Sequence, residues 1–252
     1  MINLEGQVAI ITGGSRGIGS ATARLFARAG ARVAVVYRDD IQAARKTLSG
    51  IRKSGGSGEI FRCRVENASD CRNLVKKVIK SFSGIDILVN CAGIWEYGEI
   101  DRMSPADWDR TININLTGTF NMVSSVVRKM KRQGYGRVIN IASTAGQRGE
   151  PCHSHYAASK GGVISLTKSI ATELIADGIW VNCVAPGWVL TDMVAPAMRN
   201  LKARRQILDS IPRKVIANPD EIAGPILFLA SHLADNIVGE VLNVNGGSVL
   251  CG

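Results

Sequence analysis

Several protein classes are excluded by what this sequence lacks. Its six cysteines form no CxxC pair and no zinc-type spacing, so we interpret them as free thiols in a reducing compartment and expect no metal site. Only 5% of the residues are aromatic, and they do not alternate with basic residues as a single-strand nucleic-acid platform requires. No apolar run approaches membrane-spanning length, and the opening MINLEGQVAI lacks the regions of a secretory signal. We therefore expect a cytoplasmic protein that binds neither membranes nor a specific nucleic acid.

Acidic residues are also in short supply relative to basic ones. The chain has 31 basic and 21 acidic residues, which gives a formal net charge of +10. Such an excess suits an acidic partner, although solvated helix faces are the commoner explanation. Two clusters carry part of the excess: the first basic cluster is Arg128, Lys129, Lys131 and Arg132, and the second basic cluster is Arg199, Lys202, Arg204 and Arg205.

Short aliphatic runs alternate with segments of helical periodicity. Runs at 8–12, 31–38, 85–90, 137–142, 179–185 and 240–244 predict strands, and 20–29 predicts the first helix. Runs such as IDILVN and RVINIA are apolar almost throughout, as strands buried on both faces are. We expect a single α/β domain, residues 1–252, built as a doubly wound, Rossmann-like parallel sheet flanked by helices on both faces.

The segment 188–212 differs in composition from its surroundings. It is rich in Met, Lys, Arg and Ala and contains Pro196. We expect it to form a helical lid over the substrate, with an ordinary pair of surface helices as the alternative. The GGSG sequence at 55–58 predicts an exposed turn.

A glycine-rich turn, TGGSRGIG at 12–19, follows the first predicted strand and precedes the first predicted helix. Gly13, Gly17 and Gly19 lack a Cβ, so backbone amides and a helix N-terminus can approach a pyrophosphate there. The spacing is GxxxGxG rather than the commoner GxGxxG. The strand and helix on either side make dinucleotide binding the favoured interpretation.

Tyr156 and Lys160 stand four residues apart in SHYAASKGG, which places them on one face of a helix. A phenol with an ordinary pKa of about 10 becomes a usable proton donor and acceptor when a nearby cation favours the phenolate. The spacing predicts that Lys160 is that cation, although YxxxK alone also occurs as a chance surface pair.

Six motifs follow one another along the chain. They are TGGSRGIG at 12–19, NCAG at 90–93, Asn115 in NINLTG, Ser143 in NIAST, Tyr156 with Lys160, and PGWVLTDM at 186–193. Taken together and in order, these motifs resemble the short-chain dehydrogenase/reductase family over essentially the whole chain, and most of all its 3-oxoacyl-(acyl-carrier-protein) reductase branch. Ser143 lies 13 residues before Tyr156, a spacing typical of that family.

The resemblance implies a catalytic set of four residues. Tyr156 would exchange the substrate proton, and Ser143 would hold the carbonyl oxygen of the substrate. Lys160 would bind the nicotinamide ribose and lower the pKa of Tyr156, and Asn115 would hold a water that connects Lys160 to solvent. Considered singly, Ser143 and Asn115 are more simply explained as capping or turn residues.

The resemblance also implies a set of cofactor-binding residues. Cys91 and Arg64 depart from the family pattern, which usually has Asn and Asp at these positions. Arg64 puts the usual side-chain contact to adenine in doubt and leaves stacking on adenine or contact with a phosphate open. The set comprises Gly13, Ser15, Arg16, Gly17, Ile18, Gly19, Tyr37, Arg38, Arg64, Val65, Asn90, Ala92, Gly93, Tyr156, Lys160, Pro186, Gly187, Val189 and Thr191.

The end of the second predicted strand favours NADP(H) over NAD(H). NAD-specific relatives usually have an acidic residue there, whereas VAVVYRDD places Tyr37 and then Arg38. Arg38 and Arg16 can each make charge-assisted bonds to a 2′-phosphate. Asp39 and Asp40 keep NAD(H) open as the alternative.

Substrate and assembly are less closely defined. The resemblance implies a 3-oxoacyl thioester carried by an acidic protein, which could dock at the first basic cluster, and a homotetramer to which the tail NVNGGSVLCG contributes. The loop 144–155 should border the substrate, but its Arg148, Glu150 and histidines are polar for an acyl pocket. A sugar or polyol dehydrogenase, and a catalytically silent dinucleotide-binding protein, therefore remain alternatives.

Overall fold

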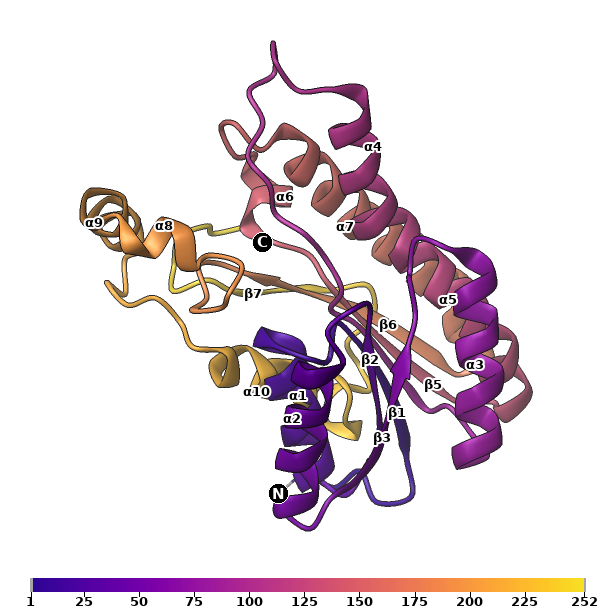
Figure 1. Ribbon diagram of the computed structural model, residues 1–252. Coiled ribbons are helices and arrows are strands. Elements are labelled where there is room, and N and C mark those ends of the chain that lie inside the picture. The colour runs from indigo at the N-terminus through magenta and orange to yellow at the C-terminus, as the bar shows by residue number, and fades with distance from the viewer. Residues whose placement is uncertain (1, 252) are drawn as a thin grey trace.

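A seven-stranded parallel sheet forms the centre of the molecule in a computed structural model, which describes residues 2–251 (Figure 1). The strand order is β3-β2-β1-β4-β5-β6-β7, so the direction of winding reverses between β1 and β4. This confirms the predicted doubly wound sheet. The strands are β1 (Val8–Thr12), β2 (Arg32–Tyr37), β3 (Ser57–Arg62), β4 (Ile87–Asn90), β5 (Gly136–Ile141), β6 (Ile179–Pro186) and β7 (Val241–Val244).

Helices cover both faces of the sheet (Figure 1). One face packs against α1 (Gly17–Arg28), α2 (Ile41–Lys53) and α10 (Pro219–Leu229). The other packs against α3 (Ala68–Phe82), α5 (Gly118–Gln133) and α7 (Ser154–Leu174). The central strands are therefore buried on both sides, which is why β1 and β4 consist of buried apolar residues almost throughout.

The remaining helices lie at or near the carboxyl ends of the strands. A π-helical turn, Asn113–Thr117, joins α4 (Pro105–Ile112) to α5. The other helices there are α6 (Thr144–Arg148), α8 (Ala195–Arg199) and α9 (Leu201–Ser210), with short 3₁₀ turns elsewhere at Ile175–Asp177 and His232–Ala234. Within the described residues 2–251, none of the helices combines the length and the apolarity that crossing a membrane requires.

Several element boundaries differ from the sequence predictions. α1 begins at Gly17 rather than at residue 20, because the glycine-rich turn passes directly into the helix. Ser57 and Gly58 belong to β3, so only the first half of GGSG forms the predicted turn. α6 interrupts the predicted loop 144–155. The segment 188–212 contains α8 and α9, neither of which has a buried residue.

Candidate active site

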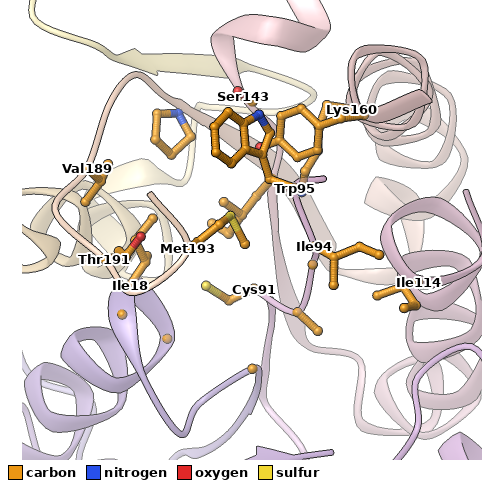
Figure 2. Close-up of a pocket in the computed structure, with 18 of the residues that line it drawn as sticks. Ile18, Cys91, Ile94, Trp95, Ile114, Ser143, Lys160, Val189, Thr191 and Met193 are labelled. Atoms are coloured by element: carbon orange, nitrogen blue, oxygen red, sulfur yellow. The ribbon is translucent and has the colours of Figure 1, made fainter. Parts of the chain in front are cut away.

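A cavity of about 440 Å³ opens at the carboxyl ends of the strands, where the winding of the sheet reverses. Loops that follow β1, β2, β4, β5 and β6 line it, so residues distant in sequence meet there (Figure 2). The predicted site residues on its wall are Gly13, Ser15, Arg16, Gly17, Ile18, Gly19, Tyr37, Arg38, Val65, Ala92, Gly93, Ser143, Tyr156, Lys160, Pro186, Gly187, Val189 and Thr191.

The glycine-rich turn forms one end of this cavity and fits a dinucleotide. Gly13 and Gly17 have φ of +62° and +53°, a region that favours glycine. A Cβ on Gly19 would lie 2.3 Å from the Gly13 carbonyl oxygen, so only glycine allows this close approach. Arg16 is the N-cap of α1 and makes no side-chain cap bond, which leaves N–H groups at the start of α1 for a phosphate.

Three arginines meet around one aspartate beside the glycine-rich turn. The Asp39 carboxylate lies 2.8 Å from Arg38 Nε, 3.1 Å from Arg62 Nη2 and 3.6 Å from Arg64 Nη2. Hydrogen bonds from Arg62 and then Arg38 hold the pKa of Asp39 below its ordinary value. Arg64 is thus directed toward Asp39, and we call Arg38, Asp39, Arg62 and Arg64 the arginine corner.

Tyr156 and Ser143 meet at the other end of the cavity. Tyr156 lies in the first turns of α7, and Ser143 precedes α6, where its hydroxyl also accepts a bond from Ala145 N at 3.1 Å. Burial raises the pKa of Tyr156 to about 12, an effect that a hydrogen bond with Ser143 partly offsets. The two hydroxyls are therefore available together at one point of the cavity wall.

Lys160 is buried one helical turn beyond Tyr156. Its Nζ donates to the Ile141 carbonyl at 2.7 Å and lies 5.8 Å from the centre of the Tyr156 ring. Burial lowers the pKa of Lys160, because the charged form loses solvation. Burial dominates the pKa of Tyr156 in this structure, and the lowering of that pKa by Lys160 stays a prediction.

Asn115 lies in the π-helical turn, fully buried behind the cavity wall. Its Oδ1 accepts from Ile94 N at 2.8 Å, and its Nδ2 donates to Ile94 O and Ser159 Oγ, each at 3.0 Å. A Cβ on Gly93 would lie 3.2 Å from Asn115 Oδ1 and 3.5 Å from Lys160 Nζ, so a side chain at this position would crowd Asn115. Asn115 therefore anchors the loop after β4 beside Lys160.

An indole and a carboxylate border the Tyr156 end of the cavity. Trp95 stacks on His153 with 4.4 Å between ring centres, and it meets Trp188 edge to face at 5.8 Å. Its Nε1 donates to Glu150 Oε1 at 3.2 Å. Burial raises the pKa of Glu150. We call Trp95, Glu150 and Trp188, which all line the cavity, the polar wall (Figure 2 shows Trp95 near Ser143).

Two predicted cofactor residues lie away from the cavity wall in the described chain. Asn90 is buried, and its Nδ2 donates to Asn140 Oδ1 at 2.9 Å, so its side chain does not line the cavity and its contact with the cofactor stays a prediction. Arg64 approaches the cavity only through Asp39. Sequence reasoning did not identify Trp95 as a wall residue, and its signal was its position just after NCAG. Trp188 and Met193 also line the wall and lie within PGWVLTDM, at the start of the predicted lid.

The two basic clusters lie at opposite edges of the sheet. α5 runs back from the cavity and ends just before β5 begins, so the first basic cluster is at the amino edge, where Lys131 bonds Asp177 at 2.7 Å. Docking of an acidic carrier protein at this cluster stays a prediction. The second basic cluster lies on α8 and α9, directly after Met193 and Val194 of the cavity wall.

Among residues 2–251, no group of three or more His, Cys, Asp or Glu side chains is arranged to hold a metal.

Comparison with known proteins gives a consistent set of relatives. A family model described as "Enoyl-(Acyl carrier protein) reductase" matches residues 13–248. The 3-oxoacyl-[acyl-carrier-protein] reductase of Synechocystis sp. is 43% identical over 251 residues, covering 99% of this chain and 100% of that protein. The corresponding reductase FabG of Thermotoga maritima is 39% identical over the same length, with 99% and 100% covered.

Solved structures give the same fold. The crystal structure of gox2181 superposes with a TM-score of 0.95 at 32% identity, covering 98% of this chain and 97% of that one. A Beutenbergia cavernae protein, provisionally described as an NAD(P)-dependent gluconate 5-dehydrogenase with bound NADP, superposes with a TM-score of 0.93 at 33% identity, covering 98% of each chain. The chains share one architecture, while the names attached to them cover more than one substrate.

Proposed function

Since the chain belongs to the short-chain dehydrogenase/reductase family, we propose that it is an NADP(H)-dependent oxidoreductase that interconverts a carbonyl and a secondary alcohol. The observation that carries the proposal is that Ser143 and Tyr156 both line the wall of a cavity whose other end is a glycine-rich turn. A silent dinucleotide-binding protein would have no need of this pair.

The arginine corner supports NADP(H) as the cofactor. Arg38 and Arg16 line the cavity near the end of β2, and Arg62 and Arg64 add positive charge around Asp39. With a 2′-phosphate bound there, the arginines would bond the phosphate in place of a carboxylate. The phosphate carries two negative charges rather than one, which strengthens each charge-assisted bond. The bound NADP in the Beutenbergia cavernae relative agrees with this assignment.

Tyr156 acts as the acid and base of the proposed reaction. NADPH, when bound, supplies the hydride for the carbonyl carbon. Tyr156 gives its hydroxyl proton to the carbonyl oxygen, and Ser143 donates a hydrogen bond to the same oxygen, so the product is a secondary alcohol. In the reverse direction, Tyr156 takes the proton from the alcohol.

Lys160 and Asn115 support Tyr156 from behind the cavity wall. Lys160 is buried one turn along α7, and its protonated form would favour the phenolate that forms when Tyr156 loses its proton. Asn115 keeps the loop after β4 in place through Ile94 and lies beside Lys160. Their roles in binding the ribose and in carrying a proton to solvent remain part of this proposal.

For the substrate we propose a 3-oxoacyl thioester. The names of the Synechocystis and Thermotoga maritima relatives support it, and the second basic cluster offers an acidic carrier protein a docking surface beside the cavity. The segment 188–212, which contributes Trp188 and Met193 to the wall, would close over the bound substrate as a lid. We further propose a homotetramer, which light scattering can test directly.

A sugar-like carbonyl compound is the second candidate substrate. The polar wall favours it, because the Glu150 carboxylate suits hydroxyl groups better than an alkyl chain. The provisional name of the Beutenbergia cavernae relative points the same way.

The test of the proposed function is oxidation of NADPH, followed by absorbance, with acetoacetyl-CoA and with simple keto sugars. We expect turnover with at least one of them, and faster turnover with NADPH than with NADH. Tight binding of NADPH without turnover of any carbonyl would favour the silent binding protein.

A further inference from the structure

We infer that the polar wall is a hydrogen-bond-accepting subsite, in which Glu150 binds a hydroxyl or amide N–H that the substrate carries near its reacting carbonyl. The inference rests on the proposed carbonyl reduction. It adds a requirement on the substrate, a hydrogen-bond donor, that carbonyl reduction by itself does not impose. A ketone without a donor group would react by the same proton and hydride transfers.

The first support for the inference is the position of Glu150. The residue lines the same cavity as Ser143 and Tyr156, so a substrate whose carbonyl meets those hydroxyls lies within reach of this side chain. The charge of Glu150 also raises the pKa of Tyr156, which places the carboxylate within electrostatic range of the phenol. The subsite is therefore next to the reacting group.

The second support for the inference is the hydrogen bonding of Glu150. Oε1 accepts from Trp95 Nε1 at 3.2 Å and lies 3.9 Å from His153 Nδ1. His153 Nδ1 has a nearer partner, the Pro151 carbonyl, at 2.9 Å. Among the described residues, no side chain or amide donates to Oε2, so one oxygen is held in place and the other is left for a ligand. A partly buried acceptor that water cannot satisfy costs free energy when it has no donor. A substrate that supplies the donor therefore binds more favourably than one that does not.

The surroundings of Glu150 hold it rigidly. Trp95 is fixed between His153 on one face and Trp188 at its edge. The two loops that carry Trp95 and Glu150 are joined where Gly98 N donates to Cys152 O at 2.8 Å. The subsite thus exists before a substrate binds, so little ordering cost accompanies recognition.

Two sources could supply the donor: the amide groups of a pantetheine-like thioester arm, or the hydroxyls of a sugar-like ketone. Matched substrate pairs distinguish them. S-acetoacetyl-N-acetylcysteamine carries an amide that S-ethyl 3-oxobutanethioate lacks, and hydroxyacetone replaces a methyl group of 2-butanone with a hydroxyl. The measured quantity is the ratio of kcat/KM within each pair, with NADPH as the cofactor.

We expect the wild type to prefer the donor-bearing member of one pair by roughly tenfold or more, as loss of one hydrogen bond to a buried acceptor implies. Glu150→Leu should reduce that ratio to about one, because it removes both oxygens while keeping the bulk. Glu150→Gln keeps one acceptor oxygen and should retain part of the ratio. Trp95→Phe removes the indole N–H that holds Glu150 and should reduce the ratio as well.

Glu99→Leu is the matched control. Glu99 is in the same loop region, accepts from the Tyr97 hydroxyl at 2.7 Å and does not line the cavity, so its ratio should equal that of the wild type. Should Glu150→Leu not fold, the ratios of Glu150→Gln and Trp95→Phe decide the matter. A wild type that does not discriminate within either pair, or Glu150 and Trp95 variants that keep the wild-type ratio, would overturn the inference alone. Failure to reduce any of the four ketones would overturn the proposed function and this inference with it.

Discussion

The two ends of the cavity differ in how far their charged side chains are exposed to water. At the Tyr156 end, Lys160 is 6% exposed and bonds a backbone carbonyl, and burial shifts the pKa of both residues. At the arginine corner, the side chains of Arg38, Arg62 and Arg64 are 44%, 63% and 56% exposed around Asp39. Electrostatic interactions are strong where water is excluded and weak where it is not. The buried end should therefore control the rate, and the exposed corner should control the choice of cofactor.

Removing the proton at the buried end should have the largest effect. Tyr156→Phe keeps the ring and deletes the hydroxyl, so we expect kcat to fall by about 10²–10⁴-fold while the Kd for NADPH changes little. Single-turnover kinetics and fluorescence titration measure the two quantities. A Phe variant with a nearly unchanged kcat would contradict the role given to Tyr156.

Reversing a charge at the exposed corner should have an intermediate effect. Arg38→Asp should lower the preference for NADPH over NADH by roughly ten- to a hundredfold, because one charge-assisted bond to phosphate is lost and a repulsion is gained. The readout is kcat/KM with both cofactors. Arg132→Asp, an equal charge change at the opposite edge of the sheet, is the control. Equal wild-type values for NADPH and NADH would refute the assignment of NADP(H).

The segment 188–212, whose first residues line the cavity, should give the smallest effect. If it acts as a lid, saturating NADPH should slow tryptic cleavage within the second basic cluster by several-fold, since binding stabilises the closed form. Gel electrophoresis of timed digests measures the rate. Identical cleavage rates with and without NADPH would leave α8 and α9 as ordinary surface helices.

The elements of the fold could be predicted from local patterns, whereas parts of the site depend on long-range packing. Continuous apolar runs predicted the buried strands, and the glycine turn predicted the position of the cavity. The π-helical turn at Asn115 could not be predicted, because no local pattern separates it from an α-helix. Glu150 and Trp95 are 55 residues apart, and their contact exists only because two strand-end loops meet.

Two features of the site could not be predicted from sequence spacing, for the same physical reason. The side chain of Asn90 bonds Asn140, and burial dominates the pKa of Tyr156. Sequence spacing gives the face of an element on which a residue lies, but not the solvation of its side chain or the partner it finds. The burial that shifts these groups is a property of the assembled fold.

The pKa of Tyr156 tests the contrast between the two ends most directly. The difference in tyrosinate absorbance between wild type and Tyr156→Phe, followed with pH, isolates this phenol from the other tyrosines. We predict a pKa of about 12 without cofactor, against an ordinary value of 10.0. The folded protein would then hold a proton that the unfolded chain has lost, so Tyr156 stabilises the fold below pH 10 and loses that contribution between pH 10 and about 12. A pKa near 10 in the cofactor-free protein would contradict the account, because Tyr156 would then be as well solvated as a surface tyrosine.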